Sequence, residues 1–313
     1  MKNYAPPYAD HWQGRKTSNA EGPLYWYQRI QAWNAATEAV PEADFALVGY
    51  ACDEGVRRNQ GRAGAAAGPS AIRQQIGKMA AHFGETTILD AGDAICPNED
   101  LEACRDTFAQ LIATLLRKGI CPIALGGGHD IAYAHFLGIQ AALEGASPTK
   151  IGIINFDAHF DLRPVIDQAN SGTPFNQILT EYPEVGYLAI GIQRAANTTT
   201  LFDVAAAKGV QYILAEDCRT ITVPEALIQF TDQYDFLFLT IDLDGFASPY
   251  APGVSAPSPM GMTPAFVEGC LRYLLATQKV RTCEVSELNP RYDQDHATAR
   301  LAARLVDMLV GKD

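Results

Sequence analysis

The segment IGIINFDAHFD, residues 151–161, carries the clearest indication of the fold of this chain. Its first part, Ile151–Asn155, is almost continuously apolar, which predicts a strand covered on both faces in a parallel sheet. Asp157, His159 and Asp161 follow at a spacing of two, and in an extended segment such side chains point the same way. Carboxylate and imidazole groups together suit Mn²⁺, Fe²⁺ or Zn²⁺. The segment therefore predicts a buried strand that ends in a metal-binding group.

The same kind of strand recurs along the chain. After a polar lead of about forty residues, short β-branched runs alternate with longer amphipathic segments, as in a parallel sheet with crossover helices. We predict eight strands: Phe45–Tyr50, Thr87–Asp90, Cys121–Leu125, Ile151–Asn155, Tyr187–Ile190, Gln211–Leu214, Phe236–Ile241 and Val280–Val285. The clearest predicted helices are Pro69 to about His82, Leu101–Lys118, Pro264–Ala276 and about Thr298 to Val310. With no linker or internal repeat, residues 1–313 are expected to form one doubly wound domain that binds ligands beyond the carboxyl ends of its strands.

Composition narrows the class of partner. The chain is 48% hydrophobic and carries 24 Lys and Arg against 36 Asp and Glu, a net charge of −12 that would repel nucleic acid and anionic membrane surfaces. It has no apolar run of the roughly 20 residues that a membrane span needs and no signal-like start, so a cytoplasmic location is expected. Its seven scattered cysteines contain no C-x-x-C pair, which argues against a disulfide framework or a zinc ribbon and favours buried or incidental thiols.

Two further motifs follow predicted strands. In LGGGHD, residues 125–130, the glycines permit a tight turn that brings His129 over the edge of the sheet. In TIDLDG, residues 240–245, an apolar strand ends in Asp242 and Asp244. A phosphate-binding role for the glycine turn would need a G-x-G-x-x-G or G-K-[ST] pattern that is absent here. A phosphatase with an aspartyl nucleophile would leave the histidines and Asp161 without roles.

The negative charges of the aspartates in these motifs indicate that the site binds cations. If the three strand ends converge, four aspartates meet, and each like-charged pair 4 Å apart costs about 4 kcal/mol at an effective dielectric constant of about 20. The motifs contain no lysine, and only Arg163 is adjacent. Two divalent ions therefore balance the four carboxylates better than ion pairs would.

The three motifs, in this order and spacing, resemble the ureohydrolase family of arginases, agmatinases and formimidoylglutamases. This resemblance implies a three-layer α/β/α fold with a mainly parallel eight-stranded sheet and two Mn²⁺ per subunit. His129 and His159 would each bind one metal, Asp244 would chelate one, and Asp157, Asp161 and Asp242 would bridge or share the pair. Two close cations lower the pKa of water from 15.7 toward neutrality, and Asp161 would orient that water and accept its proton.

Finer details resemble the formimidoylglutamase branch, whose members release L-glutamate and formamide from N-formimino-L-glutamate in histidine degradation. They are the segments WQGR (12–15), DEGVRRNQGR (53–62), SGTPF (171–175), APGVSAP (251–257) and ELNPR (287–291). Arginases and agmatinases carry a histidine where this chain has Ser171, and an Asp-Pro pair where it has Ala247 and Ser248. The first departure favours a leaving group other than a strongly basic amine, and the second favours an acidic substrate tail over a cationic one.

The resemblance also suggests residues that contact the substrate. Glu287 matches the family glutamate that binds amidine or guanidine nitrogens, and Glu284 lies deeper in its strand. Arg163 could bind a carboxylate through two hydrogen bonds. The loop after the first long strand supplies a second group that could bind an anion, from which we expect Asn59 and Arg58 to contact the substrate, together with Ser171. Arg57 and Arg62 belong to the same loop, and pairing of its arginines with Asp53 and Glu54 is the alternative.

Three alternatives stay open from the sequence. The first is a ureohydrolase for a guanidino acid such as guanidinobutyrate or guanidinopropionate, or an agmatinase-like enzyme. The second is an inactive metal-binding scaffold, although all six ligand positions are filled. The third is a deacetylase-like site with one zinc ion, which would leave the second histidine and the second-metal aspartates unexplained. The resemblance further implies a small-molecule substrate and a homo-oligomer.

Overall fold

The structure is a computed structural model that describes residues 2–18, 22–145, 147 and 149–311. Within these residues the central sheet has ten strands in the order β1-β4-β3-β5-β10-β9-β6-β7-β8, with β2 paired to β4. All pairs are parallel except β1 with β4. The strands are β1 (Tyr4–Ala5), β2 (Gln31–Ala32), β3 (Phe45–Ala51), β4 (Ile88–Ile95), β5 (Cys121–Leu125), β6 (Ile151–Phe156), β7 (Gly186–Ile192), β8 (Gln211–Leu214), β9 (Phe236–Asp242) and β10 (Val280–Ser286).

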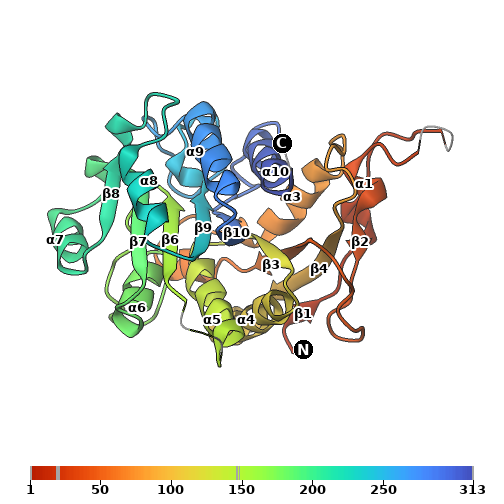
Figure 1. The fold of residues 1–313 in the computed structure, drawn as a ribbon, viewed down its shortest axis with the longest axis horizontal. Coiled ribbons are helices and arrows are strands. Elements are labelled where there is room, and N and C mark those ends of the chain that lie inside the picture. Colours follow the sequence, from red (N-terminus) through yellow and green to blue (C-terminus); the bar gives the residue numbers. More distant parts are fainter. Residues whose placement is uncertain (1, 19–21, 146, 148, 312–313) are drawn as a thin grey trace.

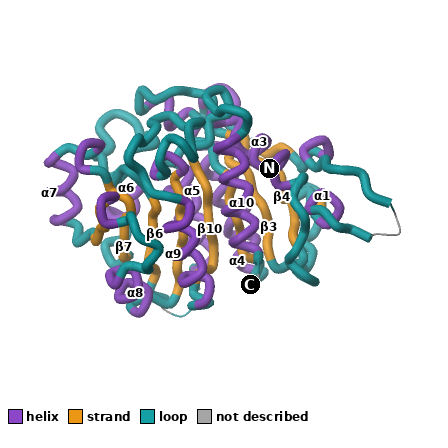
Figure 2. The backbone as a smooth tube through the Cα atoms, turned by 90° about the horizontal axis from the view of Figure 1, so that it is seen from above, coloured by secondary structure: helices purple, strands orange, loops and turns teal. Residues whose placement is uncertain are grey.

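Helices cover both faces of the sheet and make a three-layer α/β/α arrangement (Figure 1). On one face α10 packs against α3 and α9, and on the other α5 packs between α4 and α6. Figure 2 shows strands of the sheet running side by side with helices alongside them. The α-helices are α1 (Trp26–Arg29), α2 (Glu54–Arg58), α3 (Gly68–Ile76), α4 (Leu101–Arg117), α5 (Ile131–Leu143), α6 (Pro174–Glu181), α7 (Thr199–Ala207), α8 (Glu225–Asp232), α9 (Pro264–Ala276) and α10 (Ala297–Val310).

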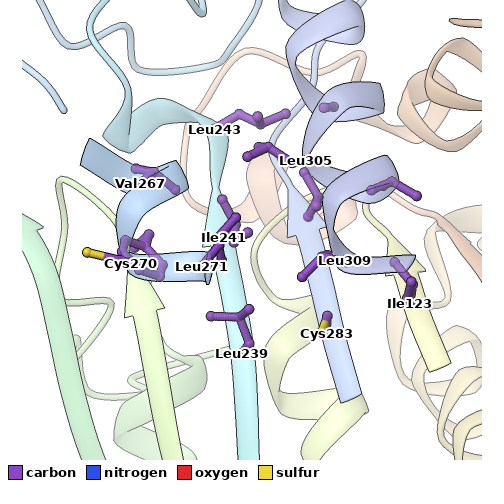
Figure 3. Packing of buried hydrophobic residues seen from close by; sticks show 14 of the residues in the cluster. Ile123, Leu239, Ile241, Leu243, Val267, Cys270, Leu271, Cys283, Leu305 and Leu309 are labelled. Carbon is purple, nitrogen blue, oxygen red and sulfur yellow. The ribbon is translucent and has the colours of Figure 1, made fainter. Parts of the chain in front are cut away.

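The largest hydrophobic cluster fills the space between the sheet and helices α9 and α10. Leu239 of β9 and Cys283 of β10 pack with Leu271 of α9 and Leu309 of α10 (Figure 3). All four side chains are buried. Full burial of one leucine side chain contributes roughly 1.5–3 kcal/mol. The cluster therefore holds β9 and β10 firmly in the middle of the sheet.

The mainly parallel sheet and all eight predicted strands are confirmed, but the predicted number of strands was too low. The two further strands, β1 and β2, have two residues each and lie in the polar lead, where no apolar periodicity marks them. This polar N-terminal segment packs against the rest of the protein, because its Trp26 and Trp33 side chains are buried. No helix among the described residues is long and apolar enough to cross a membrane.

The helix predicted from Pro69 ends earlier than expected. It stops at Ile76 rather than near His82. The residues that follow form hydrogen bonds with the polar N-terminal segment instead of continuing the helix. The carbonyl oxygen of Met79 accepts a hydrogen bond from the backbone N–H of Trp26 at 3.0 Å, and the N–H of Ala81 donates to the carbonyl of Leu24 at 2.9 Å. Sequence periodicity does not show a contact between segments so far apart.

Candidate metal centre and active site

Four neighbouring strands carry the candidate residues at their carboxyl ends. His129 lies between β5 and α5, Glu287 follows β10, Asp242 ends β9, and Asp157 follows β6. The strands are adjacent in the order β5-β10-β9-β6. Because all of them run parallel, their carboxyl ends meet at one edge of the sheet, where ligands bind in doubly wound folds.

All six predicted metal ligands meet at this edge, in two overlapping groups. The first contains His129, Asp157, Asp161 and Asp242, and the second contains Asp157, His159 and Asp244. In each group the possible ligand atoms lie within 4.8 Å of one another. Asp157 is the member that both groups share, whereas the family resemblance implied that Asp161 and Asp242 would also bridge or share the pair.

Distances within the first group converge on the ring of His129. Its Nδ1 atom lies 3.1 Å from Asp157 Oδ2, 2.9 Å from Asp161 Oδ2 and 3.0 Å from Asp242 Oδ2. In the second group, His159 Nδ1 lies 3.4 Å from Asp157 Oδ1 and 3.3 Å from Asp244 Oδ2. The two oxygens of Asp157 therefore face different groups.

The donor atoms fit divalent cations. His129 Nδ1 is buried and makes no hydrogen bond with any of the residues that the structure describes, although three carboxylate oxygens surround it. His129 Nε2 lies 2.9 Å from Thr240 Oγ1. If Nε2 carries the proton and donates it to Thr240, the lone pair of Nδ1 points into the carboxylates, as metal coordination requires. Four aspartates this close together, three of them buried, would be very unfavourable without compensating positive charge.

The pKa values of the site show how much negative charge it holds. Burial, together with the carboxylate of Asp157, raises the pKa of Asp161 to about 6. Burial and then Asp242 raise the pKa of Asp244 well above its usual range. Burial opposes the charging of His129, but Asp242 and its neighbours still raise the pKa of His129 well above the ordinary value. Besides burial, the carboxylates raise these pKa values by lying close together, and bound cations would offset their charge.

The loop after β6 bends, contrary to the expectation of an extended segment through Asp161. Asp161 has a φ of +49°, a left-handed conformation that is uncommon for residues other than glycine. Asn197 supports this bend from the segment after β7. Its side chain donates to the carbonyl of Ala158 at 2.9 Å and accepts from the N–H of Phe160 at 3.0 Å. The bend, rather than strand alternation, brings Asp157, His159 and Asp161 together.

The glycine turn before His129 is also explained by close contact. A Cβ atom on Gly127 would lie 1.7 Å from the carbonyl oxygen of Cys52, so a larger residue does not fit there. The N–H of Gly128 donates to the same oxygen at 3.0 Å. The turn therefore fixes His129 against the end of β3.

Glu287 lies next to the metal groups. Its Oε1 accepts a hydrogen bond from the backbone N–H of His129 at 2.7 Å, and its own N–H donates to the carbonyl of Gly127 at 2.8 Å. Burial raises the pKa of Glu287 well above its usual range, and the carboxylates of Asp242 and Asp244 raise it further. The carboxylate of Glu287 could therefore bind a cationic group in the cavity.

The candidate residues line a cavity of about 320 Å³. Arg163 lies at this cavity, and its side chain makes no ion pair or hydrogen bond with any residue in the described part of the chain. Asn59 Nδ2 donates to Ser171 Oγ at 3.1 Å on the same wall. Among the residues that line the cavity are His129, His159, Asp161, Asp242, Asp244, Glu287, Asn59, Arg163 and Ser171, whereas Asp157 is buried and absent from the lining.

The prediction that Arg58 contacts the substrate is not supported by its position. Arg58 Nε lies 2.8 Å from Glu54 Oε1, and Arg58 Nη1 lies 2.8 Å from Glu102 Oε1. Arg58 borders a neighbouring cavity instead. Because Glu102 belongs to α4, this pairing depends on how α4 packs against the loop, which the sequence does not reveal.

Several lining residues were missing from the predicted substrate contacts. They come from the loops after β3, β7 and β9 and from α7, and they include Gln60, Arg62, Asn197, Leu201, Ser255 and Ala256. Arg62 and Ser255 lie in the quoted segments DEGVRRNQGR and APGVSAP, so those segments gave a partial signal. Asn197 and Leu201 lie in no motif.

The fold and the paired His/Asp groups define an α/β enzyme whose site is suited to metal ions. Residues 43–311 match the arginase family. The chain is 42% identical over 317 residues to the formimidoylglutamase of Aeromonas salmonicida (strain A449), covering 99% of each chain. It is 40% identical to the formimidoylglutamase of Geobacillus thermodenitrificans (strain NG80-2), covering 96% of this chain and 94% of that one.

Solved structures agree with this assignment. The fold is similar to that of Trypanosoma cruzi formiminoglutamase with Mn²⁺, with a TM-score of 0.78, 26% identity and coverage of 86% of this chain and 92% of that chain. It is also similar to formimidoylglutamase from Bacillus subtilis, with a TM-score of 0.80, 24% identity and coverage of 90% and 89%. The chain belongs to the arginase family, and the resemblance found in its motifs is confirmed.

Proposed function

We propose that this protein hydrolyses the formimino C–N bond of N-formimino-L-glutamate and releases L-glutamate and formamide. The observation that carries the proposal is that Glu287 and Arg163 both line the cavity beside the metal groups. Glu287 offers a carboxylate for a cationic N-C-N group, and Arg163 offers an unpaired guanidinium for a carboxylate. The relatives at 42% and 40% identity are named formimidoylglutamase, which supports the same substrate.

The proposed cofactor is a pair of Mn²⁺ ions in each subunit. His129, Asp157, Asp161 and Asp242 would hold one ion, and Asp157, His159 and Asp244 would hold the other. The relative from Trypanosoma cruzi was solved with Mn²⁺. When bound, two such cations lower the pKa of a water molecule toward neutrality and so supply a nucleophile.

The residues of the chain position the substrate around that nucleophile. Glu287 Oε1 is held by the N–H of His129, which leaves Oε2 to accept from the N–H groups of the formimino end. Arg163 binds a carboxylate at the other end of the substrate. Asn59 donates to Ser171 Oγ, so the Ser171 hydroxyl keeps its own proton for a substrate oxygen.

Asp161 is the proposed proton carrier. Its Oδ2 faces His129, and the side chain lines the cavity. Asp161 accepts a proton as water adds to the formimino carbon, and it returns the proton to the nitrogen of glutamate as the C–N bond breaks. The water oxygen leaves in formamide.

A guanidino acid is the second candidate substrate, because it also has a cationic head and a carboxylate. The same Glu287 and Arg163 would bind it, but hydrolysis would release urea. Product analysis by NMR of the Mn²⁺-loaded protein separates the two. Formamide and glutamate from N-formimino-L-glutamate support the proposal, and urea from guanidinobutyrate with no formamide formation overturns it. Metal-loaded protein that is inert on all amidines and guanidines would support an inactive scaffold.

We further propose the cellular setting that this reaction implies. A protein with this activity would act in histidine degradation, in the cytoplasm, on a small-molecule substrate. We propose a homo-oligomer, which sedimentation of the purified protein would test.

A further inference from the structure

Arg62 lines the cavity, although the proposed reaction gives it no role. It lies in the loop after β3 and shares the cavity with Glu287 and Arg163. N-formimino-L-glutamate has two carboxylates, and Arg163 binds only one of them. The other carboxylate therefore needs a second cationic partner.

The loop after β3 holds three arginines, and two of them are already paired with carboxylates. Arg57 Nε lies 2.6 Å from Glu54 Oε2, and Arg58 Nε lies 2.8 Å from Oε1 of the same glutamate. Arg62 forms no ion pair with any carboxylate in the part of the chain that the structure describes. Its positive charge is therefore available to an anion in the cavity.

Hydrogen bonds hold the guanidinium of Arg62 in place without using all of its donors. Its Nε donates to the carbonyl of Ser255 at 2.9 Å, and its Nη2 donates to the carbonyl of Val254. Arg62 Cζ also lies 3.9 Å from the centre of the Tyr292 ring, a contact that favours a cation. Nη1 makes no hydrogen bond with any residue that the structure describes, so it keeps its N–H groups for a ligand.

The backbone of Arg62 is fixed as well. Its N–H donates to Ser255 Oγ at 2.8 Å, and its carbonyl accepts from Asn289 Nδ2 at 2.7 Å. These contacts tie Arg62 to the loops after β9 and β10, whereas the N–H of Arg163 donates to the carbonyl of Gly172, before α6, at 2.9 Å. The two arginines are thus held by different loops. Groups that are fixed in advance bind a ligand with a smaller loss of entropy.

We propose, on the basis of the proposed function, that Arg62 binds the carboxylate of N-formimino-L-glutamate that Arg163 does not bind. The α-carboxylate branches from the carbon that carries the formimino nitrogen, and the γ-carboxylate ends the side chain, so the two groups lie in different directions. Each forms charge-assisted hydrogen bonds with one guanidinium. Arg62 thereby makes the site selective for a dicarboxylate over a guanidino acid with a single carboxylate.

Calorimetric titration of the full-length, Mn²⁺-loaded protein with three ligands, in which a formyl group replaces the formimino group, tests this assignment. N-formyl-L-glutamate carries both carboxylates, N-formyl-L-norvaline carries only the α-carboxylate, and 4-formamidobutanoate carries only the carboxylate at the end of the chain. We expect the wild-type protein to bind N-formyl-L-glutamate about tenfold or more tightly than either of the others. Equal affinity for the dicarboxylate and either monocarboxylate overturns the proposal.

The same titrations of variants assign one carboxylate to each arginine. In Arg62→Met we expect affinity to fall about tenfold or more for N-formyl-L-glutamate and for one monocarboxylate, and to stay within about twofold for the other. Arg163→Ala should show the reverse selectivity between the two monocarboxylates. Arg57→Met removes an exposed arginine of the same loop that is paired with Glu54, and it should leave all three affinities unaltered.

Three results for Arg62→Met overturn the proposal. They are equal losses for all three ligands, which would mean that Arg62 only holds its loop, unaltered affinities, and the same pattern as in Arg163→Ala. Circular dichroism checks that the variant is folded. If it is not, Arg62→Lys replaces it and should show the same pattern with a smaller loss, because lysine lacks the planar fork of arginine.

The proposed function is tested separately, by formamide release from N-formimino-L-glutamate. Absence of formamide together with dicarboxylate selectivity that depends on Arg62 would overturn the proposed function and leave the role of Arg62 standing. Formamide release with an unaltered Arg62→Met would do the opposite.

Discussion

Glu287 Oε1 accepts the backbone N–H of His129 at 2.7 Å, so the residue that we assign to substrate binding is fixed to the turn that carries a metal ligand. Glu287 itself has a φ of +67°. Such a backbone conformation is costly for a residue other than glycine and is found most often at functional sites. The contact links the end of β10 to the loop after β5.

Replacing Glu287 with Gln tests the charge of this residue. An amide oxygen still accepts the N–H of His129, but the negative charge is lost. Charged hydrogen bonds contribute about 1.5–3 kcal/mol, so we expect kcat/KM to fall about 10- to 100-fold with an unchanged metal content. Steady-state kinetics and elemental analysis measure the two quantities. Unaltered kcat/KM would remove Glu287 from the substrate contacts.

Replacing His159 with Ala tests the division of the ligands into two groups. His159 belongs only to the group with Asp157 and Asp244. We expect the bound Mn²⁺, counted by mass spectrometry of the dialysed protein, to fall from two ions per chain toward one, and turnover to fall with it. His82→Ala is the control, because His82 lies at a different cavity. Two tightly bound ions in His159→Ala would contradict the grouping.

The sequence predicted the interior of the sheet, and the meeting of the candidate ligand residues at one edge of it, for a physical reason. Strands such as β6 and β9 are covered on both faces, so they are continuously apolar, and their carboxyl ends must lie together in a parallel sheet. Contacts set by packing were not predictable. The ion pair of Arg58 with Glu102 and the support that Asn197 gives to the bend at Asp161 join segments that are far apart in the chain. The short strands β1 and β2 carry no pattern at all.

Metal binding should strengthen as the pH rises. In the metal-free protein the carboxylates around His129 and His159 raise the pKa values of both imidazoles well above 6.5, and the pKa of Asp161 is about 6. These groups hold protons near neutral pH and below, and Mn²⁺ must displace them. We expect the association constant to fall at least tenfold from pH 8 to pH 6, with proton release seen by calorimetry in buffers of different ionisation enthalpy. An association constant that does not change with pH would contradict this electrostatic description.

The buried ion pairs of Arg73 are predicted to be essential for stability. Arg73 lies on α3, and its guanidinium contacts Asp90 at 2.9 Å and Asp93 at 2.6 Å on β4. Removing one partner of a buried pair typically costs 3–5 kcal/mol, so Arg73→Met should lower the free energy of unfolding by about that amount. Urea unfolding measures it, with the exposed Arg300→Met as a control expected within about 0.5 kcal/mol of the wild type. Equal stability of the two variants would show that the pairs contribute little.

The most direct measurement is the kcat/KM of the Mn²⁺-loaded protein for N-formimino-L-glutamate, guanidinobutyrate, agmatine and arginine under one set of conditions. We predict that N-formimino-L-glutamate is the best substrate. We also predict that Arg163→Ala raises its KM about tenfold or more, whereas Arg272→Ala, an exposed change on α9, leaves KM unaltered. A preference for a guanidino compound or an unchanged KM in Arg163→Ala would contradict the account.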